Sequence, residues 1–155
     1  MSFCLQALFG LRREESIKII PAWADRGDCL VLKDSWTKGG REREIPIRTA
    51  EQRALKALAR GKSLIAPRYK SYRDYLKYFR YQCERVGIHS FHGHRHSYAQ
   101  CRYKELTGRE CPAREGTKSK QLTPNQRAID RQAREVISRE MGHRREQVTA
   151  VYLGR

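Results

Sequence analysis

The apolar residues near the start of the chain follow a helical spacing that one glycine interrupts. They are Phe3, Leu5, Leu8, Leu11 and Ile17, with Gly10 between the third and the fourth. Apolar residues three or four positions apart lie on one face of a helix. The pattern therefore predicts a helix followed by a shorter helical piece within residues 2–18.

The period changes to that of strands in the next segment. Two short apolar runs, 29–32 and 44–47, are joined by a loop that contains the Gly-Gly pair 39–40. Such a pair between two strand-like runs favours a hairpin. With residues 19–20 as a further strand, we expect a small three-stranded antiparallel sheet.

Helical spacing returns after the hairpin and continues almost to the end of the chain. It predicts helices over 49–61, 71–86, 90–106 and 123–142, and a short last helix around 148–152. The segment 108–123 is rich in Gly, Pro, Ser and Thr and is expected to be a loop. The predicted fold is α+β and mainly helical, with the small sheet packed on a helical bundle in one domain over 1–155.

The charge of the chain points to a polyanionic partner. Its 33 Lys and Arg against 17 Asp and Glu give a formal net charge of +16. A compact domain tolerates such self-repulsion best when a polyanion neutralises it, which favours nucleic acid. The basic residues are spread through every segment, no run of about 18 apolar residues exists, and no secretory signal opens the chain, so we expect a cytoplasmic protein without membrane contact.

Cysteine and histidine content gives little support to disulfides or metals. The five cysteines form no C-x-x-C pair, so we expect reduced thiols that mostly pack in the interior. Four histidines stand at His89, His92, His94 and His96. Alternate histidines on a helix point apart and no cysteine or acid stands beside them, so we expect neither a metal nor another cofactor.

Four clusters could carry chemistry, and two of them lie near the N-terminus. Arg12 and Glu15 stand three residues apart on one helical face, where the carboxylate can hold the guanidinium as a fork for phosphate oxygens. Lys38 stands on the glycine turn of the hairpin and could reach a site as a point charge. Each pattern alone is more typical of solvated surface residues.

The other two clusters lie further along the chain. His92 and Arg95 share a helical face, which suits proton transfer beside charge stabilisation. His143 and Tyr152 would face opposite ways on one continuous helix. Gly142 can break that helix and let the last segment return Tyr152 toward His143.

In their order and spacing these clusters resemble the catalytic domain of the tyrosine recombinases, the phage-integrase family. Residues 10–15 (GLRREE) are similar to the family's first arginine box, and 37–46 (TKGGREREIP) to its lysine hairpin. Residues 92–99 (HGHRHSYA) are similar to its His-x-x-Arg-His box. Met-Gly-His at 141–143, followed by Thr-Ala-Val-Tyr at 149–152, is similar to its final box with the nucleophile.

The resemblance implies metal-free cleavage and rejoining of DNA through a 3′-phosphotyrosyl intermediate. The implied catalytic residues are Arg12 and Arg95 on the phosphate oxygens, Lys38 as the acid, His92 as the base, His143 on the phosphate, and Tyr152 as the nucleophile. Glu15 and His96 are expected to support these groups from behind. Further arginines are expected to bind DNA, namely Arg13, Arg41, Arg43, Arg144 and Arg145.

The resemblance also implies a setting for the chain. We expect a bacterial or phage-encoded, nucleoid-associated protein that acts on a recombination site in double-stranded DNA. The full-length protein is expected to form a tetramer on DNA, and this chain, read as a monomeric fragment, lacks the N-terminal DNA-clamp domain and the C-terminal exchanged helix. Gly93-His94 replaces an apolar residue of the pattern, and residues 102–128 are longer than is typical, which suggests an insertion.

Three alternatives stay open from the sequence. A catalytically inactive DNA-binding relative would keep the charge but lose strand cleavage. A type IB topoisomerase would use similar chemistry to relax DNA without a partner strand. An RNA-binding, ribosome-associated protein is suggested by charge alone and leaves the four clusters unexplained.

Overall fold

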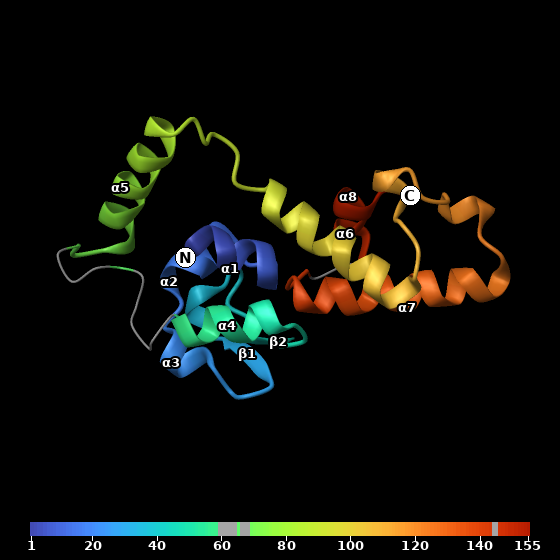
Figure 1. Cartoon of the computed structure of the whole chain (residues 1–155), viewed down its shortest axis with the longest axis horizontal. Helices are drawn as coiled ribbons and strands as arrows, with labels where there is room; N and C mark the ends of the chain where they lie inside the picture. The colour runs from blue at the N-terminus through green and yellow to red at the C-terminus, as the bar shows by residue number, and fades with distance from the viewer. Residues whose placement is uncertain (59–64, 66–68, 144–145) are drawn as a thin grey trace.

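The computed structural model describes residues 1–58, 65, 69–143 and 146–155. Its first half contains α1 (Ser2–Phe9), α2 (Arg13–Lys18), α3 (Pro21–Ala24), β1 (Cys29–Leu32), the 3-10 turn η1 (Asp34–Trp36), β2 (Arg43–Pro46) and α4 (Ala50–Leu58). Its second half contains α5 (Tyr72–Arg85), α6 (Gly93–Thr107), η2 (Pro112–Arg114), η3 (Ser119–Gln121), α7 (Pro124–Glu140), η4 (Glu146–Val148) and α8 (Ala150–Leu153). The expectation of a mainly helical fold with a small antiparallel sheet is confirmed (Figure 1).

The sheet has two strands within the described residues, so the expected third strand at 19–20 is wrong. Ile19 caps the C-terminus of α2, where its N–H bonds the carbonyl of Glu15 at 3.0 Å. The Ile20 carbonyl already accepts the first bonds of α3, and Pro21 occupies the first turn of that helix. Ile19 is buried because it packs into the core between two helices and not because it pairs with a strand.

The hairpin formed by β1 and β2 carries the glycine turn that was expected. Leu30 pairs with Ile45 and Leu32 pairs with Arg43. At the tip, the Thr37 hydroxyl donates to the Arg41 carbonyl at 2.7 Å and accepts from the Arg41 N–H at 2.8 Å. These bonds close the loop that presents Lys38.

Three apolar clusters hold the molecule together. The first joins α1, α3 and the hairpin around Phe9, Leu32 and Ile45. The second joins α6, α7 and α8 around Ile137 and Leu153. The third fixes α5 to α2 and α1, through residues that include Ile17, Phe79 and Phe3. Figure 1 shows α1 to α4 with the hairpin as one lobe and α6 to α8 as a second lobe beside it.

Capping side chains mark the starts of α5 and α7. Thr123 and Gln126 form the capping box that begins α7, and Ser71 accepts the Asp74 N–H at the start of α5. Helix α6 begins at Gly93, later than the sequence predicted, and His92 is its N-cap. The expected end of α4 near residue 61 lies outside the described residues.

The length and apolar content of the helices show whether any of them could cross a membrane. Across the described ranges, none of the helices combines the length and the apolar character that crossing a membrane requires.

Candidate active site

The first part of the site is the start of α2, where the Glu15 carboxylate caps the helix by accepting from Arg12. The Glu15 carboxylate accepts the Arg12 backbone N–H at 2.6 Å and the Arg12 Nη1 at 2.7 Å. The Arg12 Nη2 also donates to the Gly142 carbonyl at 3.3 Å, so this arginine links α2 to the end of α7. Its side chain is 24% exposed and can still meet a ligand.

A second arginine holds the same carboxylate. Arg43 of β2 donates from Nη1 and Nη2 to the two oxygens of Glu15, at 2.9 and 2.7 Å, and from Nε to the Glu140 carbonyl at 3.0 Å. Burial by itself would raise the pKa of Glu15, but the hydrogen bonds and charges of Arg43 and Arg12 lower it to about 2. Glu15 is therefore ionised at neutral pH and holds two guanidinium groups in place.

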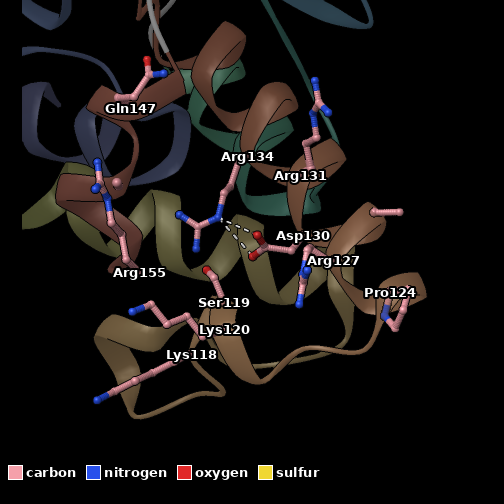
Figure 2. A pocket seen from close by; sticks show the side chains of 12 residues that line it. Lys118, Ser119, Lys120, Pro124, Arg127, Asp130, Arg131, Arg134, Gln147 and Arg155 are labelled. Atoms are coloured by element: carbon pink, nitrogen blue, oxygen red, sulfur yellow. Dashed lines mark hydrogen bonds and ion pairs between the residues drawn. The ribbon is translucent and has the colours of Figure 1, made fainter.

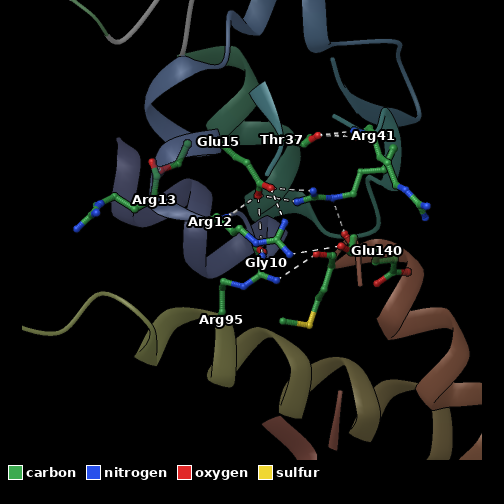
Figure 3. A network of polar contacts seen from close by, with 12 residues as sticks. Gly10, Arg12, Arg13, Glu15, Thr37, Arg41, Arg95 and Glu140 are labelled. Atoms are coloured by element: carbon green, nitrogen blue, oxygen red, sulfur yellow. Dashed lines mark hydrogen bonds and ion pairs between the residues drawn. The ribbon is translucent and has the colours of Figure 1, made fainter. Parts of the chain in front are cut away.

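Arg95 of α6 is the most deeply buried cation of the site, with 1% of its surface exposed. Its Nη1 donates to the Gly10 carbonyl, and its Nη2 donates to the Met141 carbonyl at 3.1 Å. Glu15 lies 4.0 Å from Nη1. The pKa of Arg95 is lowered by burial and then by the charge of Arg12, while Tyr152 and Glu15 oppose that shift. Figure 3 shows Arg95 extending from α6 toward Gly10, with Arg12 beside it near Glu15.

His143 lies directly beside Arg95, after the turn in which Gly142, at φ +68°, ends α7. Its Nε2 is 3.2 Å from the Arg95 Nη2, and its Nδ1 is 3.0 Å from the Thr149 hydroxyl. A guanidinium can only donate, so we assign Nε2 as the acceptor and Nδ1–H as the donor to Thr149. Burial and then the charges of Arg95 and Arg12 lower the pKa of His143 to about 4, so the ring is neutral at pH 7.

Tyr152 of α8 lies against this cluster and is half-buried. Its ring stacks on His143 with centroids 5.3 Å apart, and it lies 4.6 Å from the ring of His96. The Arg95 guanidinium carbon is 5.7 Å from its centroid. Tyr152 was expected to lie near His143, and it does so because η4 and α8 turn the chain back along α6.

Lys38 and His92 meet the arginines at a cavity of about 430 Å³, whose lining includes Arg12, Lys38, His92 and Arg95. Lys38 and His92 are both exposed. A neighbouring cavity of about 600 Å³ is lined by Arg12, Lys38 and His143 among others. The two cavities share Arg12 and Lys38 in their linings, so these two expected catalytic cations border both cavities.

Histidine positions differ from the expectation in one respect. Among the described residues, the ring contacts of Tyr152 are with His96 and His143, whereas His92 stands at the rim of the cavity. The pKa of His96 is lowered by burial and then by the charges of His92 and Arg95. His96 was expected to lie behind the reacting groups, and it packs directly on the ring of the expected nucleophile.

The arginines expected on DNA fall into three groups. Arg13 and Arg41 line the cavities and point away from the Glu15 cluster on opposite sides (Figure 3). Arg43 is 9% exposed and its guanidinium bonds Glu15, so the structure places it inside the protein and not on a DNA-binding surface. Arg144 and Arg145 lie outside the described residues.

The role of Arg43 could have been found from the strand period. Residues two apart on a strand lie on one face, and Arg43 stands two before the buried Ile45. A charged residue on a buried face needs a partner, and Glu15 is that partner. By contrast, no local signal marks the carbonyls of Gly10 and Met141, which hold Arg95 from distant segments.

Comparison with known proteins gives one match. The family model described as "Integrase" matches residues 1–101. No curated protein and no solved structure matches the chain. The matched range includes Arg12, Lys38, His92 and Arg95, while His143 and Tyr152 follow it. Within the described residues, no three His, Cys, Asp or Glu side chains gather in a way that could hold a metal ion.

Proposed function

This chain belongs to the integrase family, and on that premise we propose that it is a site-specific DNA recombinase that cleaves and rejoins strands through Tyr152. One observation carries the proposal. The buried Arg95 touches His143 and faces the ring of Tyr152 at a junction that also includes Arg12. Two fixed guanidinium groups beside a phenol suit attack on a phosphodiester, whose charge grows in the transition state.

The proposed step is an in-line displacement at phosphorus. The Tyr152 oxygen bonds to the phosphorus as the bond to the 5′-oxygen breaks, which leaves a 3′-phosphotyrosyl link and a free 5′-hydroxyl. The phenol proton goes to His92, and Lys38 donates a proton to the leaving 5′-oxygen. A 5′-hydroxyl from a partner strand reverses the step, so bond energy is conserved and no nucleotide cofactor is consumed.

Attack by the Tyr152 hydroxyl needs cationic groups close to the reacting phosphate. An ordinary tyrosine has a pKa near 10 and is a poor nucleophile at neutral pH. Arg95 lies under the ring, and Arg12 supplies a second charge at the same junction. Both charges would stabilise the negative charge that grows on the phosphate oxygens in the transition state. His96 packs on the ring and positions it, and His92 is the proton acceptor because it lines the cavity with Lys38 and both arginines.

His143 is proposed to change partner when the phosphate arrives. In the free protein its Nε2 accepts from Arg95, so it cannot donate there. A phosphate would offset the charges of Arg95 and Arg12 that lower its pKa. His143 could then take a second proton and donate to a phosphate oxygen. Exchange between two duplexes needs one nucleophile per strand for four strands, so we propose that four copies act together on DNA.

The test is capture of covalently bound DNA. Wild-type protein is incubated with a pool of nicked duplexes of randomised sequence, in which cleavage releases a short fragment and traps the adduct. Denaturing electrophoresis is expected to show a protein–DNA conjugate, peptide mapping to place it at Tyr152, and Tyr152→Phe to lose it while still binding DNA. Tyr81→Phe is the matched control, because Tyr81 is 57% exposed on α5.

Other outcomes select the alternatives. A conjugate that persists in Tyr152→Phe refutes the nucleophile. Absence of any conjugate with wild-type protein that binds duplex DNA favours an inactive DNA-binding relative. Relaxation of supercoiled plasmid without recombined product favours topoisomerase chemistry.

A further inference from the structure

A second basic cavity lies along the first three turns of α7, and the proposed active site lies at the C-terminal end of that helix. It has a volume of about 1070 Å³. Its cationic lining residues are Lys118, Lys120, Arg127, Arg131, Arg134 and Arg155. The lysines come from the segment around η3, inside the stretch that the sequence suggested to be an insertion. Figure 2 shows these side chains around a common space, with Arg134 at its centre.

Arg134 gives the cavity a built anchor. Its side chain is 6% exposed, its Nε bonds Asp130 at 2.9 Å, and its Nη1 donates to the Gly154 carbonyl at 3.0 Å. The remaining amino group, Nη2, is buried and has no hydrogen-bond partner among the described residues. A buried donor without an acceptor costs free energy, and an anion in the cavity would satisfy it.

The cations around Arg134 are spread over the rim of the cavity, an arrangement that suits a polyanion with repeated charges. Asp130, the acid among the described lining residues, is already bonded by Arg134 and by the Tyr103 hydroxyl at 2.6 Å. Lys118, Lys120 and Arg127 are exposed at the rim. A single small anion can meet only a few of these groups at once. Repeated phosphates along a strand can meet several of them.

The cavity is physically joined to the helix of the proposed nucleophile. Ala150 and Arg155 line it, and Gly154, which accepts the bond from Arg134, is the second residue after Tyr152. Along α7, the lining residues Pro124 and Arg134 lie roughly 24 and 9 Å from the C-terminal residue Glu140, given the rise per residue of a helix. One DNA duplex could therefore contact both the cavity and the proposed active site. A phosphate bound by Arg134 would act on the segment of Tyr152 through the hydrogen bond from Arg134 to Gly154.

We propose that this cavity is a second DNA-backbone site, which binds phosphodiester groups other than the one that is cleaved. The inference rests on the proposed function for the identity of the partner, double-stranded DNA, and not on the role of Tyr152. Arg134 anchors one phosphate through Nη2, and the rim lysines Lys118 and Lys120 meet its neighbours along the strand. The inserted segment thereby gains a function as an extension of the DNA-binding surface.

The experiment measures the salt dependence of DNA binding. The slope of log K against log salt is negative, and each lost phosphate contact lowers its magnitude by about 0.9. Fluorescence anisotropy with a labelled duplex compares the protein with its Lys118→Gln/Lys120→Gln variant over about 50 to 200 mM KCl. All proteins carry Tyr152→Phe, so covalent chemistry plays no part. We expect the magnitude of the slope to fall by about 1.8 and the affinity near 0.1 M salt to fall by more than tenfold.

The matched control removes the same charge elsewhere. Lys77→Gln/Arg80→Gln neutralises two exposed cations on α5. We expect it to change the slope by less than half as much, with melting temperatures unchanged in both double variants. Arg134 is not the residue to replace first, because it also holds Asp130 and the chain end.

Each contrary result has its own meaning. Equal slopes for the two double variants would overturn the second site and leave the proposed function standing. Failure of the parent protein to bind duplex DNA at all would instead overturn the partner that the proposed function assumes. Displacement of the duplex by low millimolar inorganic phosphate, abolished in Lys118→Gln/Lys120→Gln, would assign the cavity to a free anion and not to a strand.

Discussion

Arg95 and Arg134 are both buried arginines that donate to a glycine carbonyl far away in the chain, yet their charges are handled differently. Arg95 shares one carboxylate, Glu15, with Arg12 and Arg43. Arg134 has a carboxylate of its own, Asp130, one helical turn earlier. Three cations around one acid leave the first cluster with uncompensated positive charge in the interior. The second cluster is neutral at its centre and positive at its exposed rim.

This difference separates two ways of binding phosphate. Charge that is buried and fixed in direction acts strongly on one ligand group at one position, because little water screens it. Charge on exposed lysines and arginines attracts a polyanion over a distance and is weakened by salt. The first arrangement suits the reacting phosphate, and the second suits the rest of the strand.

The largest expected effect comes from removing the two acids in turn. Glu15→Gln leaves three guanidinium groups without a counter-charge in a buried place, and we expect the free energy of unfolding to fall by about 3 to 5 kcal/mol. Asp130→Asn leaves a single arginine that borders a wide cavity and keeps the Gly154 carbonyl, so we expect a loss of about 1 to 3 kcal/mol. Urea denaturation of both variants measures the difference.

The ratio of the two losses is the informative quantity. Equal losses would mean that the sharing of Glu15 has no energetic consequence, and the contrast between the clusters would then be geometric alone. Glu15→Asp is a useful comparison, since it keeps the charge but shortens the reach to Arg43. We expect it to recover part of the loss.

A smaller effect is expected at the two glycine carbonyls. Gly10 has a positive φ of +60°, and a Cβ there would lie 2.5 Å from the Tyr98 ring. Tyr98 is fixed by its hydrogen bond to Glu140 at 2.8 Å, so it cannot move aside easily. Gly10→Ala is therefore expected to cost about 2 to 3 kcal/mol by strain and overpacking, and to reduce cleavage because the acceptor of Arg95 shifts.

Gly154→Ala is the matched substitution at the other arginine. Its Cβ would meet the Ala113 backbone nitrogen at 2.8 Å. Gly154 is half-buried whereas Gly10 is buried, so the segment around Gly154 has more room to shift, and we expect a cost of about 1 kcal/mol. Thermal melts of the two variants give the comparison. A larger loss for Gly154→Ala would show that the contact with the Ala113 backbone is the more rigid of the two.

The sequence predicted the helices well where caps and apolar spacing agreed. The helix starts expected at residues 71 and 123 are confirmed, and the structure shows Ser71 and Thr123 accepting the N–H groups of Asp74 and Gln126 there. The strand at 19–20 failed because two branched apolar residues are compatible with several buried conformations, and Pro21 begins a helix there. A short apolar run does not show by itself whether its residues pair in a sheet or pack in the core in another conformation.

For the candidate site, spacing along the chain identified residues but not their partners. Arg12, Arg95, His143 and Tyr152 were singled out, and the structure brings them together. Whether a buried arginine bonds a carboxylate, a carbonyl or a ligand depends on segments distant in sequence. Arg43 was therefore assigned to DNA although it bonds Glu15.

The last expected effect is a pH dependence that belongs to the Arg95 cluster. The folded pKa of His143 is lowered from 6.5 to about 4, first by burial and then by Arg95. Between these values the unfolded chain binds a proton that the folded chain does not, so stability is fully present above pH 6.5 and is lost as the pH falls toward 4. Because the ring is only part-buried, we expect a contribution of about 1 to 2 kcal/mol.

His143→Gln isolates this contribution, since the amide oxygen can still accept from Arg95 while the group no longer titrates. Urea denaturation from pH 4.5 to about 7 should show a shallower rise in stability for the variant than for the parent protein. The pKa of His96 is lowered as well, so His96→Gln is the control for the remaining slope. The Glu15 window is separate, because its folded pKa of about 2 confines that loss to pH values below 4.5. An unchanged slope in His143→Gln would mean that the arginines do not reach His143 electrostatically, and the proposed response of this ring to phosphate would lose its physical basis.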